Sequence, residues 1–176
     1  MPPPPPVARV VDVLIASPGD AQSARNAAER ECHNWNGART LSEQIIFRPR
    51  RWELDSVSLV HDGTDPQSVL NRQLVDSAHV LIVILRHRLG SPTPRAVSGT
   101  AEELERMVQA GKPVHCYFST QSLPNNADLE QVQALRNFKH ELSRRGLVAD
   151  FKSLDHLREQ IRRALEFDAR LLNGDH

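Results

Sequence analysis

The sequence predicts a single open α/β domain, in which a parallel sheet carries helices on both faces. Short runs of β-branched and other apolar residues, such as residues 10–17 and 80–85, have the composition of strands buried on both sides. Amphipathic segments with apolar residues three or four positions apart follow these runs, so strand and helix alternate five times. This alternation is typical of parallel sheets whose crossover connections are helices.

Five parallel strands leave few topologies, because crossovers between them are right-handed. We expect the flavodoxin-like order 2-1-3-4-5. The second strand is expected within residues 44–52, where Pro49 cannot donate a ladder hydrogen bond and so favours an edge position. The fourth and fifth strands are expected at residues 114–118 and 147–151.

Capping residues and glycines set the expected ends of the helices. Asp20 could begin the first helix and Gly37 could stop it. Asp65-Pro66 opens the next one, with a capping residue followed by proline at the first helical position. The remaining helices are expected at residues 100–110, at about 129–142 and from residue 154 onward.

The length of 176 residues suits one domain of ordinary size. We expect a disordered, proline-rich leader at residues 1–7, a single domain at residues 8–172 and a short tail at residues 173–176. Lys+Arg and Asp+Glu both number 22, so the formal net charge is zero. That balance argues against a dedicated nucleic-acid or anionic-membrane binder, which normally has a basic excess.

The cysteine pattern and the N-terminus indicate a cytoplasmic protein. Cys32 and Cys116 are far apart and form no CxxC pair, so we expect reduced, buried thiols. The proline-rich start lacks the basic and apolar regions of a signal peptide. The longest apolar run, residues 80–85, is too short to span a bilayer.

In the expected strand order, ligands bind where the first and third strands end. The first of these strands is followed by Ser17 and the backbone N–H groups of the next helix, which can bind an anion or a ribose hydroxyl. Gly19 lets a ligand approach the backbone closely. Asp20 either accepts hydrogen bonds from a ligand or is a plain N-cap. Neither GxGxxG nor GxxxxGK[ST] occurs, so no dinucleotide fingerprint or P-loop is predicted.

The helix after the third strand begins with an acidic pair. Either Ser98 or Thr100 can cap it, and with Thr100 as the cap Glu103 would be the capping-box partner. Alternatively, the Glu103 carboxylate points into the cleft and stabilises an oxocarbenium-like centre or attacks it. Glu102 is the second choice, because it should turn toward solvent, about 100° away on the helix.

Four other side chains each allow a binding and a structural interpretation. Arg86 and Arg88 could bind a pyrophosphate or could be solvated loop cations. Trp52 could stack on a nucleobase or nicotinamide ring, or simply pack. Arg25 could reach the cleft or form a surface pair with a nearby acid. No metal site is expected, because the three histidines near the strands lack ligand spacing; they are His79, His87 and His115.

Residues 10–118 resemble a family. VLIASPGD, Asp65-Pro66-Gln67, SAHVLIVILRHRLGSPT, SGTAEELERM and GKPVHCYFS together resemble the TIR-like domains often fused to NTPase modules, and more distantly TIR domains and nucleoside 2-deoxyribosyltransferases. The resemblance implies a flavodoxin-like sheet and, in catalytic members, cleavage of the N-glycosidic bond of NAD or a nucleoside. The GTxxE spacing of the deoxyribosyltransferases corresponds to Gly99, Thr100 and Glu103.

The resemblance implies a function as an NAD glycohydrolase or ADP-ribosyl cyclase in immune or antiphage defence. NAD would be the substrate and no cofactor would be required. Substrate would be held by residues on both sides of the cleft, namely Ser17, Gly19, Asp20, Trp52, Arg86, Arg88, Ser98 and Thr100. The family also implies self-association or an attached sensor module. The alternatives are a non-catalytic assembly module and a deoxyribosyltransferase-like enzyme.

Overall fold

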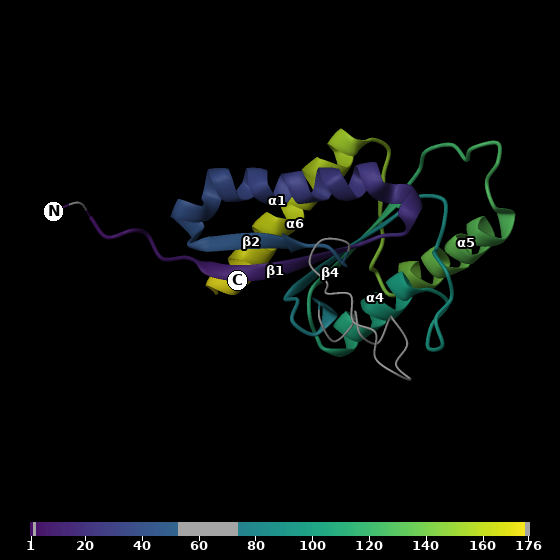
Figure 1. Ribbon diagram of the computed structural model, residues 1–176, viewed down its shortest axis with the longest axis horizontal. Helices are drawn as coiled ribbons and strands as arrows, with labels where there is room; N and C mark the ends of the chain where they lie inside the picture. Colours follow the sequence, from purple (N-terminus) through teal and green to yellow (C-terminus); the bar gives the residue numbers. More distant parts are fainter. Residues whose placement is uncertain (2, 53–73, 175–176) are drawn as a thin grey trace.

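The computed structural model describes residues 1, 3–52 and 74–174. Its five strands form one parallel sheet in the order β2-β1-β3-β4-β5, which confirms the predicted topology (Figure 1). Edge strand β2 carries Pro49, as expected. The strands span β1 Arg9–Ala16, β2 Ile45–Arg50, β3 Val80–Leu85, β4 Val114–Ser119 and β5 Ala149–Phe151.

Helices cover both faces of the sheet. They are a short 3₁₀ helix η1 (Gly19–Ala21), α1 (Gln22–Glu43), α4 (Gly99–Gln109), α5 (Leu129–Arg144) and α6 (Leu154–Asn173). One face packs on α1 and α6, which lie side by side, and the other packs on α4 and α5 (Figure 1). The helix predicted from Asp65-Pro66 lies largely outside the described residues. Its expected apolar positions Leu74 and Val75 are buried.

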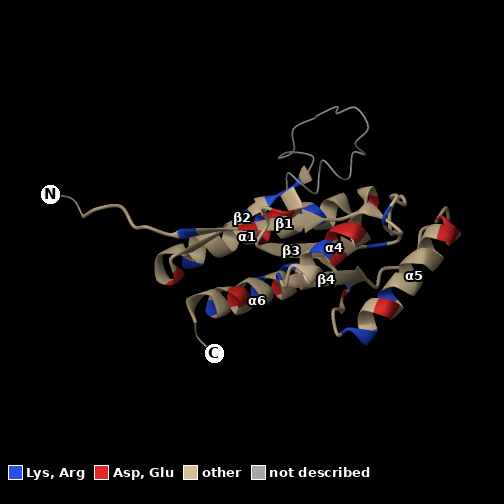
Figure 2. Ribbon diagram, turned by 90° about the horizontal axis from the view of Figure 1, so that it is seen from below, with Lys and Arg blue, Asp and Glu red and all other residues tan. Residues whose placement is uncertain are grey.

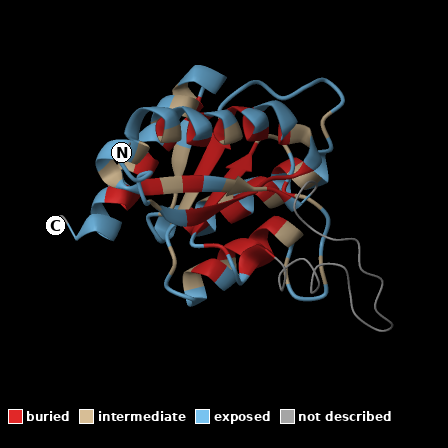
Figure 3. Ribbon diagram, turned by 60° about the vertical axis from the view of Figure 1, so that its left-hand side comes forward, coloured by how far each residue is buried: buried red, intermediate tan, exposed pale blue. Residues whose placement is uncertain are grey.

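The core is divided by the sheet into two apolar layers. Every residue of β3 is buried, because helices cover this central strand on both faces (Figure 3). On the α1/α6 side, Trp35 meets Phe47 edge to face, with ring centroids 4.7 Å apart. Acidic and basic residues are interspersed along α5 and α6 (Figure 2). None of the helices in the described ranges is long and apolar enough to cross a membrane.

Helix α1 is longer than predicted. Gly37 does not end it, and the helix continues to Glu43 before Gln44 adopts a left-handed conformation, with φ of 56°. A mid-helix glycine costs only about 1 kcal/mol. The neighbouring Asn36 compensates through two tertiary hydrogen bonds, because its amide accepts from the Phe47 N–H and donates to the Phe47 carbonyl.

Strand β5 is shorter than predicted because the first expected residues belong to the end of α5. Gly146 has a φ of 71°, and the Leu147 N–H donates to the Leu142 carbonyl. This is the 6→1 hydrogen bond of a Schellman motif, which commonly ends a helix. The strand therefore begins only at Ala149.

Both cysteines are buried and neither forms a disulfide, in agreement with the sequence prediction. Burial in the core disfavours the thiolate and raises the pKa of both Cys32 and Cys116 to about 12. Both thiols are therefore neutral and unreactive at physiological pH.

Candidate functional site

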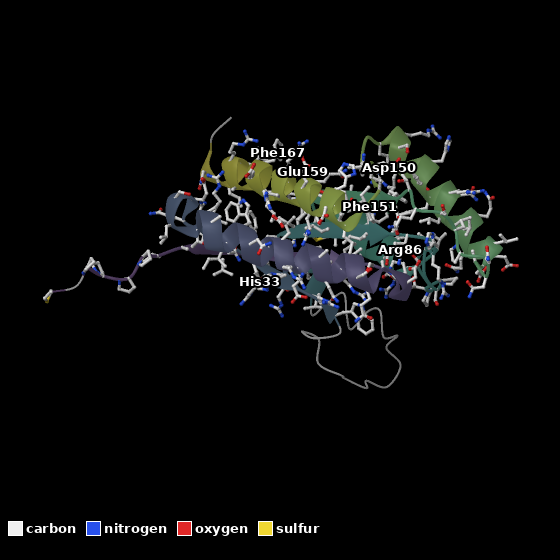
Figure 4. All side chains as sticks on the ribbon, turned by 90° about the horizontal axis from the view of Figure 1, so that it is seen from above. His33, Arg86, Asp150, Phe151, Glu159 and Phe167 are labelled. Atoms are coloured by element: carbon white, nitrogen blue, oxygen red, sulfur yellow. The ribbon has the colours of Figure 1, made fainter. Side chains whose placement is uncertain are left out.

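The loops that follow β1 and β3 meet above the carboxyl edge of the sheet. The Arg86 guanidinium donates to the Asp20 carbonyl over 3.0 Å, and Arg86 lies between the start of α1 and α5 (Figure 4). Gly90 lies next to both Pro18 and Ser98, since a methyl group on its Cα would stand 3.8 Å from Pro18 Cγ and 3.6 Å from Ser98 Cβ. Two segments distant in sequence therefore converge here, as the predicted strand order requires.

Asp20 links the two loops and does not act as a helix cap. Neither η1 nor α1 receives a side-chain cap, so the N-cap interpretation is wrong. One carboxylate oxygen, Oδ2, instead accepts the His87 backbone N–H over 3.0 Å. The other oxygen, Oδ1, is buried and has no hydrogen-bond partner among the described residues. An unfilled acceptor thus lies at the junction of the loops.

Ser17 provides a second polar atom at this junction. Its Oγ is buried and has no hydrogen-bond partner within the described part of the chain. Its carbonyl accepts a 3.0 Å hydrogen bond from the buried Arg25 guanidinium. Arg25 is therefore not at the surface, as one of its two interpretations required, because α1 packs this position against the end of β1.

Helix α4 begins two residues earlier than a Thr100 cap would allow. Ser98 is the N-cap, with an extended backbone and an Oγ that accepts the Ala101 N–H over 3.1 Å. The capping-box position is then Ala101, so a capping-box role for Glu103 is wrong. The Glu103 residue is 6% exposed and lies at the beginning of the second turn. Thr100 is buried in the first turn.

Glu102 does not turn toward solvent as predicted. It is buried, and its carboxylate accepts hydrogen bonds from Thr93 Oγ1 at 2.8 Å and from the Arg95 guanidinium at 3.2 Å. The loop after β3 folds back over the first turn of α4 and covers this side chain. Periodicity along the helix could not reveal a covering loop. Glu102 therefore holds the loop that borders the junction.

The other predicted ligand-binding residues differ in their exposure and in their hydrogen bonds. Gly19 has open space beside it, since an added Cβ would meet nothing within 4 Å. Arg86 also donates to the Gln121 side chain, so it joins the β1 and β4 loops. Arg88 is exposed. Trp52 is 46% exposed and lies two residues beyond Arg50, which pairs with Leu14 of β1.

Two residues that shape the junction were not identified from the sequence. Gly90 adopts a φ of 102°, which favours glycine, and the Gln131 side chain accepts both the Leu89 and the Gly90 N–H, over 3.1 and 3.0 Å. A glycine before a Ser-Pro pair is a turn signal that could have marked Gly90. No local pattern marks Gln131, because its role depends on how α5 packs.

The junction therefore offers unfilled polar atoms on one side and buried acidic residues on the other. Ser17 Oγ can donate or accept a hydrogen bond, and Asp20 Oδ1 can accept one. These groups suit a ligand rich in hydroxyls. Within the described residues, no three side chains of the metal-binding types form a cluster.

Comparisons with known proteins place the chain in a family. A search of curated proteins found no significant match. Among solved structures, the RPS4 and RRS1 TIR domain heterodimer is 13% identical and covers 93% of this chain and 99% of its own, with a TM-score of 0.49. A flavodiiron protein from Giardia intestinalis is 13% identical over 89% of this chain and 34% of its own, with a TM-score of 0.40. Both similarities are too distant to support a functional argument. The family model described as "Domain of unknown function (DUF4062)" matches residues 15–166, and the chain therefore belongs to the DUF4062 family.

Proposed function

We propose that this protein cleaves the N-glycosidic bond between nicotinamide and ribose in NAD, at the junction of the β1 and β3 loops. Nicotinamide leaves as a neutral base with the bonding electron pair, because its ring nitrogen is positively charged in NAD. Water then adds to the ribosyl carbon and loses a proton, which gives ADP-ribose. Attack by a group of the substrate itself would give a cyclic product instead.

The observation that carries this proposal is the buried Glu103 carboxylate in the helix that begins at the junction. Its position is not accounted for by capping, because Ser98 and Ala101 fill those roles. In a buried site, a carboxylate interacts more strongly with developing positive charge than it does in water. Glu103 is therefore assigned to stabilise the ribosyl oxocarbenium ion or to attack it.

The polar atoms on the β1 side support binding of the ribose. Ser17 Oγ and Asp20 Oδ1 lack partners among the described residues, and a sugar hydroxyl can bond to either. Open space beside Gly19 permits close approach of the ligand. The exposed Arg88 guanidinium suits the pyrophosphate, and the half-exposed Trp52 ring suits stacking on nicotinamide or adenine.

The biological setting of the proposal follows from the resemblance seen in the sequence. Through three motifs, the chain resembles TIR-like domains that act in defence and work after self-association or with a sensor module. The motifs are SPGD, RLGSPT and SGTxEE. We assign a role in defence to this protein as well, and we place it in the cytoplasm, as the cysteine pattern indicates. Activity would then depend on local concentration.

Release of nicotinamide tests the proposal. The protein is incubated with NAD both in dilute solution and clustered on a scaffold, and free nicotinamide is measured by chromatography. Wild type should release nicotinamide, faster when clustered. Glu103→Gln should reduce release by roughly 100-fold or more, because a positioned catalytic carboxylate contributes at least that factor.

Glu105→Gln is the matched control. Glu105 lies two residues further along α4 and pairs with Arg145 near the surface, so its loss should leave release unchanged. Circular dichroism melts establish that each variant is folded. Undiminished release by a folded Glu103→Gln protein would contradict the proposal. Absence of any release, even from clustered protein, would favour the assembly-module alternative.

A further inference from the structure

A cavity of about 270 Å³ lies at the opposite edge of the sheet, where the strands begin. Val11 of β1, Val80 of β3 and Pro113 before β4 line it, together with Leu171 and Leu172 from the last turn of α6. The end of α6 lies beside the start of β1 (Figure 1), where the Arg9 guanidinium donates to the Leu172 carbonyl. Phe167, near this end of α6, is far from Arg86 in Figure 4. The cavity is therefore separate from the candidate active site.

A buried acidic residue, Asp168, is among those that line this mainly apolar cavity. Asp168 is only 1% exposed, because it lies on the face of α6 that packs in the core. Its Oδ2 forms a 2.9 Å hydrogen bond with His115 Nε2. Its Oδ1 has no hydrogen-bond partner among the residues that the structure describes. Such an unfilled buried acceptor is uncommon and calls for a partner.

The neighbouring polar side chains are engaged elsewhere. Lys112 also lines the cavity, but its ammonium group donates to the backbone carbonyls of Asp76 and Ala78, over 2.9 and 2.6 Å. His79 Nδ1 accepts the Asp12 N–H. None of these hydrogen bonds involves the second carboxylate oxygen of Asp168.

The volume and the lining favour an organic molecule over water. One water occupies about 30 Å³ of the liquid, so the cavity has room for several waters or for a small organic molecule. The apolar walls of the cavity offer water few hydrogen-bond partners, whereas a hydrocarbon group can pack against them. A carboxylate acceptor forms its strongest hydrogen bonds with charged donors and disfavours anions.

We propose that this cavity binds a small, mainly apolar amine. The ammonium group donates to Asp168 Oδ1, and the hydrocarbon body lies between the two valines and the leucines of α6. This inference is independent of the proposed reaction with NAD.

Benzylamine is the probe, and benzoate is its matched anionic counterpart of similar shape. Each is titrated into protein with labelled valine and leucine methyl groups, and binding is followed by NMR. Benzylamine should cause saturable shifts at Val11, Val80, Leu171 and Leu172, whereas benzoate should cause none there. Asp168→Asn should weaken benzylamine binding by roughly tenfold or more, because a charge-assisted hydrogen bond is lost.

Two further variants keep the test decisive. Asp155→Asn removes an exposed acid at the other end of α6 and should leave the affinity unchanged. Leu172 is 42% exposed, so Leu172→Trp can fill the mouth of the cavity without disturbing the core, and it should abolish the shifts. The inference is overturned by an absence of saturable shifts, by equal binding of benzoate, or by benzylamine binding that Leu172→Trp leaves intact.

Discussion

At the scale of single residues, Asp20 shows how one side chain can join two distant loops. Its Oδ2 accepts the His87 N–H, and its carbonyl accepts the Arg86 guanidinium. The second carboxylate oxygen is buried without a partner among the described residues, and the same holds for the Ser17 Oγ. Asp20 therefore has two roles at the junction: it holds the two loops together, and it provides a hydrogen-bond acceptor.

The substitution Gly19→Ala tests whether a ligand approaches the loop after β1. A Cβ at this position meets nothing within 4 Å, so Gly19→Ala should leave the melting temperature unchanged. If NAD lies against this backbone, the added methyl group should displace it and reduce nicotinamide release by roughly tenfold to 100-fold. Gly37→Ala is the control, because its surroundings are equally open and it lies within α1. That variant should keep full activity, and an equal loss in both variants would contradict this assignment.

Asp12 predicts a pH dependence of stability. Hydrogen bonding to Arg48, at 2.5 and 2.8 Å, holds the pKa of this carboxyl below its ordinary value. A depressed folded-state pKa means that Asp12 stabilises the fold fully above the unfolded pKa of about 4, and that this contribution is lost as the pH falls below it. Arg48 is 53% exposed, so the contribution is about 1 kcal/mol or less.

Urea unfolding of wild type and Asp12→Asn at pH 7 and pH 3 measures that contribution. The variant should be less stable at pH 7, and the difference should shrink at pH 3 as wild type becomes protonated. An equal difference in unfolding free energy at both pH values would show that the ion pair is not its source.

The sequence predicted which residues lie near the junction better than it predicted what they contact. Ser17 and Asp20 follow a strand whose end is recognisable, so their location follows from topology. Glu102 was expected to face solvent, and a surface pair was one of two interpretations of Arg25, yet both residues are buried. Their burial depends on how a loop and a helix pack, and local periodicity contains no information about that packing.

At the scale of elements, the start of α4 depends on one hydroxyl group. Ser98 is completely buried, and its Oγ accepts the Ala101 N–H. Ser98→Ala should lower the unfolding free energy by about 0.5–2 kcal/mol, the usual cost of losing an N-cap. It should also reduce nicotinamide release, because Glu103 depends on the register of this helix.

Ser153→Ala provides a control of the same kind. Ser153 caps α6 through an equivalent bond to the His156 N–H, also 3.1 Å long. The two variants should lose similar stability in urea unfolding, but Ser153→Ala should retain full nicotinamide release. A parallel loss of activity in both would indicate that general destabilisation, and not the position of Glu103, explains the effect.

The existence of the elements was predictable, but their ends were not. Buried strands such as β3 and amphipathic helices such as α6 have clear periodicity. The end of α1 was misplaced because the side chain of Asn36 ties the helix to β2 across the fold. The start of β5 was misplaced because Gly146 and Leu147 complete a helix-closing turn.

At the scale of the whole molecule, the two edges of the sheet have different character. The carboxyl edge gathers polar loops that converge from distant parts of the sequence, as the strand order predicted. The amino edge has a mainly apolar cavity with the buried Asp168 in its lining, and no motif in the sequence marks it. Topology locates a site at a strand-order reversal, whereas a cavity depends on side-chain packing.

The proposed reaction requires that NAD binds at the carboxyl edge of the sheet. The most direct test is an NMR titration of backbone amides with NAD, in the Glu103→Gln variant so that the substrate remains intact. If NAD binds there, saturable shifts should occur at Gly19, Gly90 and Thr100, and none at Leu172 beside the opposite edge. Saturation without shifts in the β1 and β3 loops, or shifts confined to the α6 end of the molecule, would contradict it.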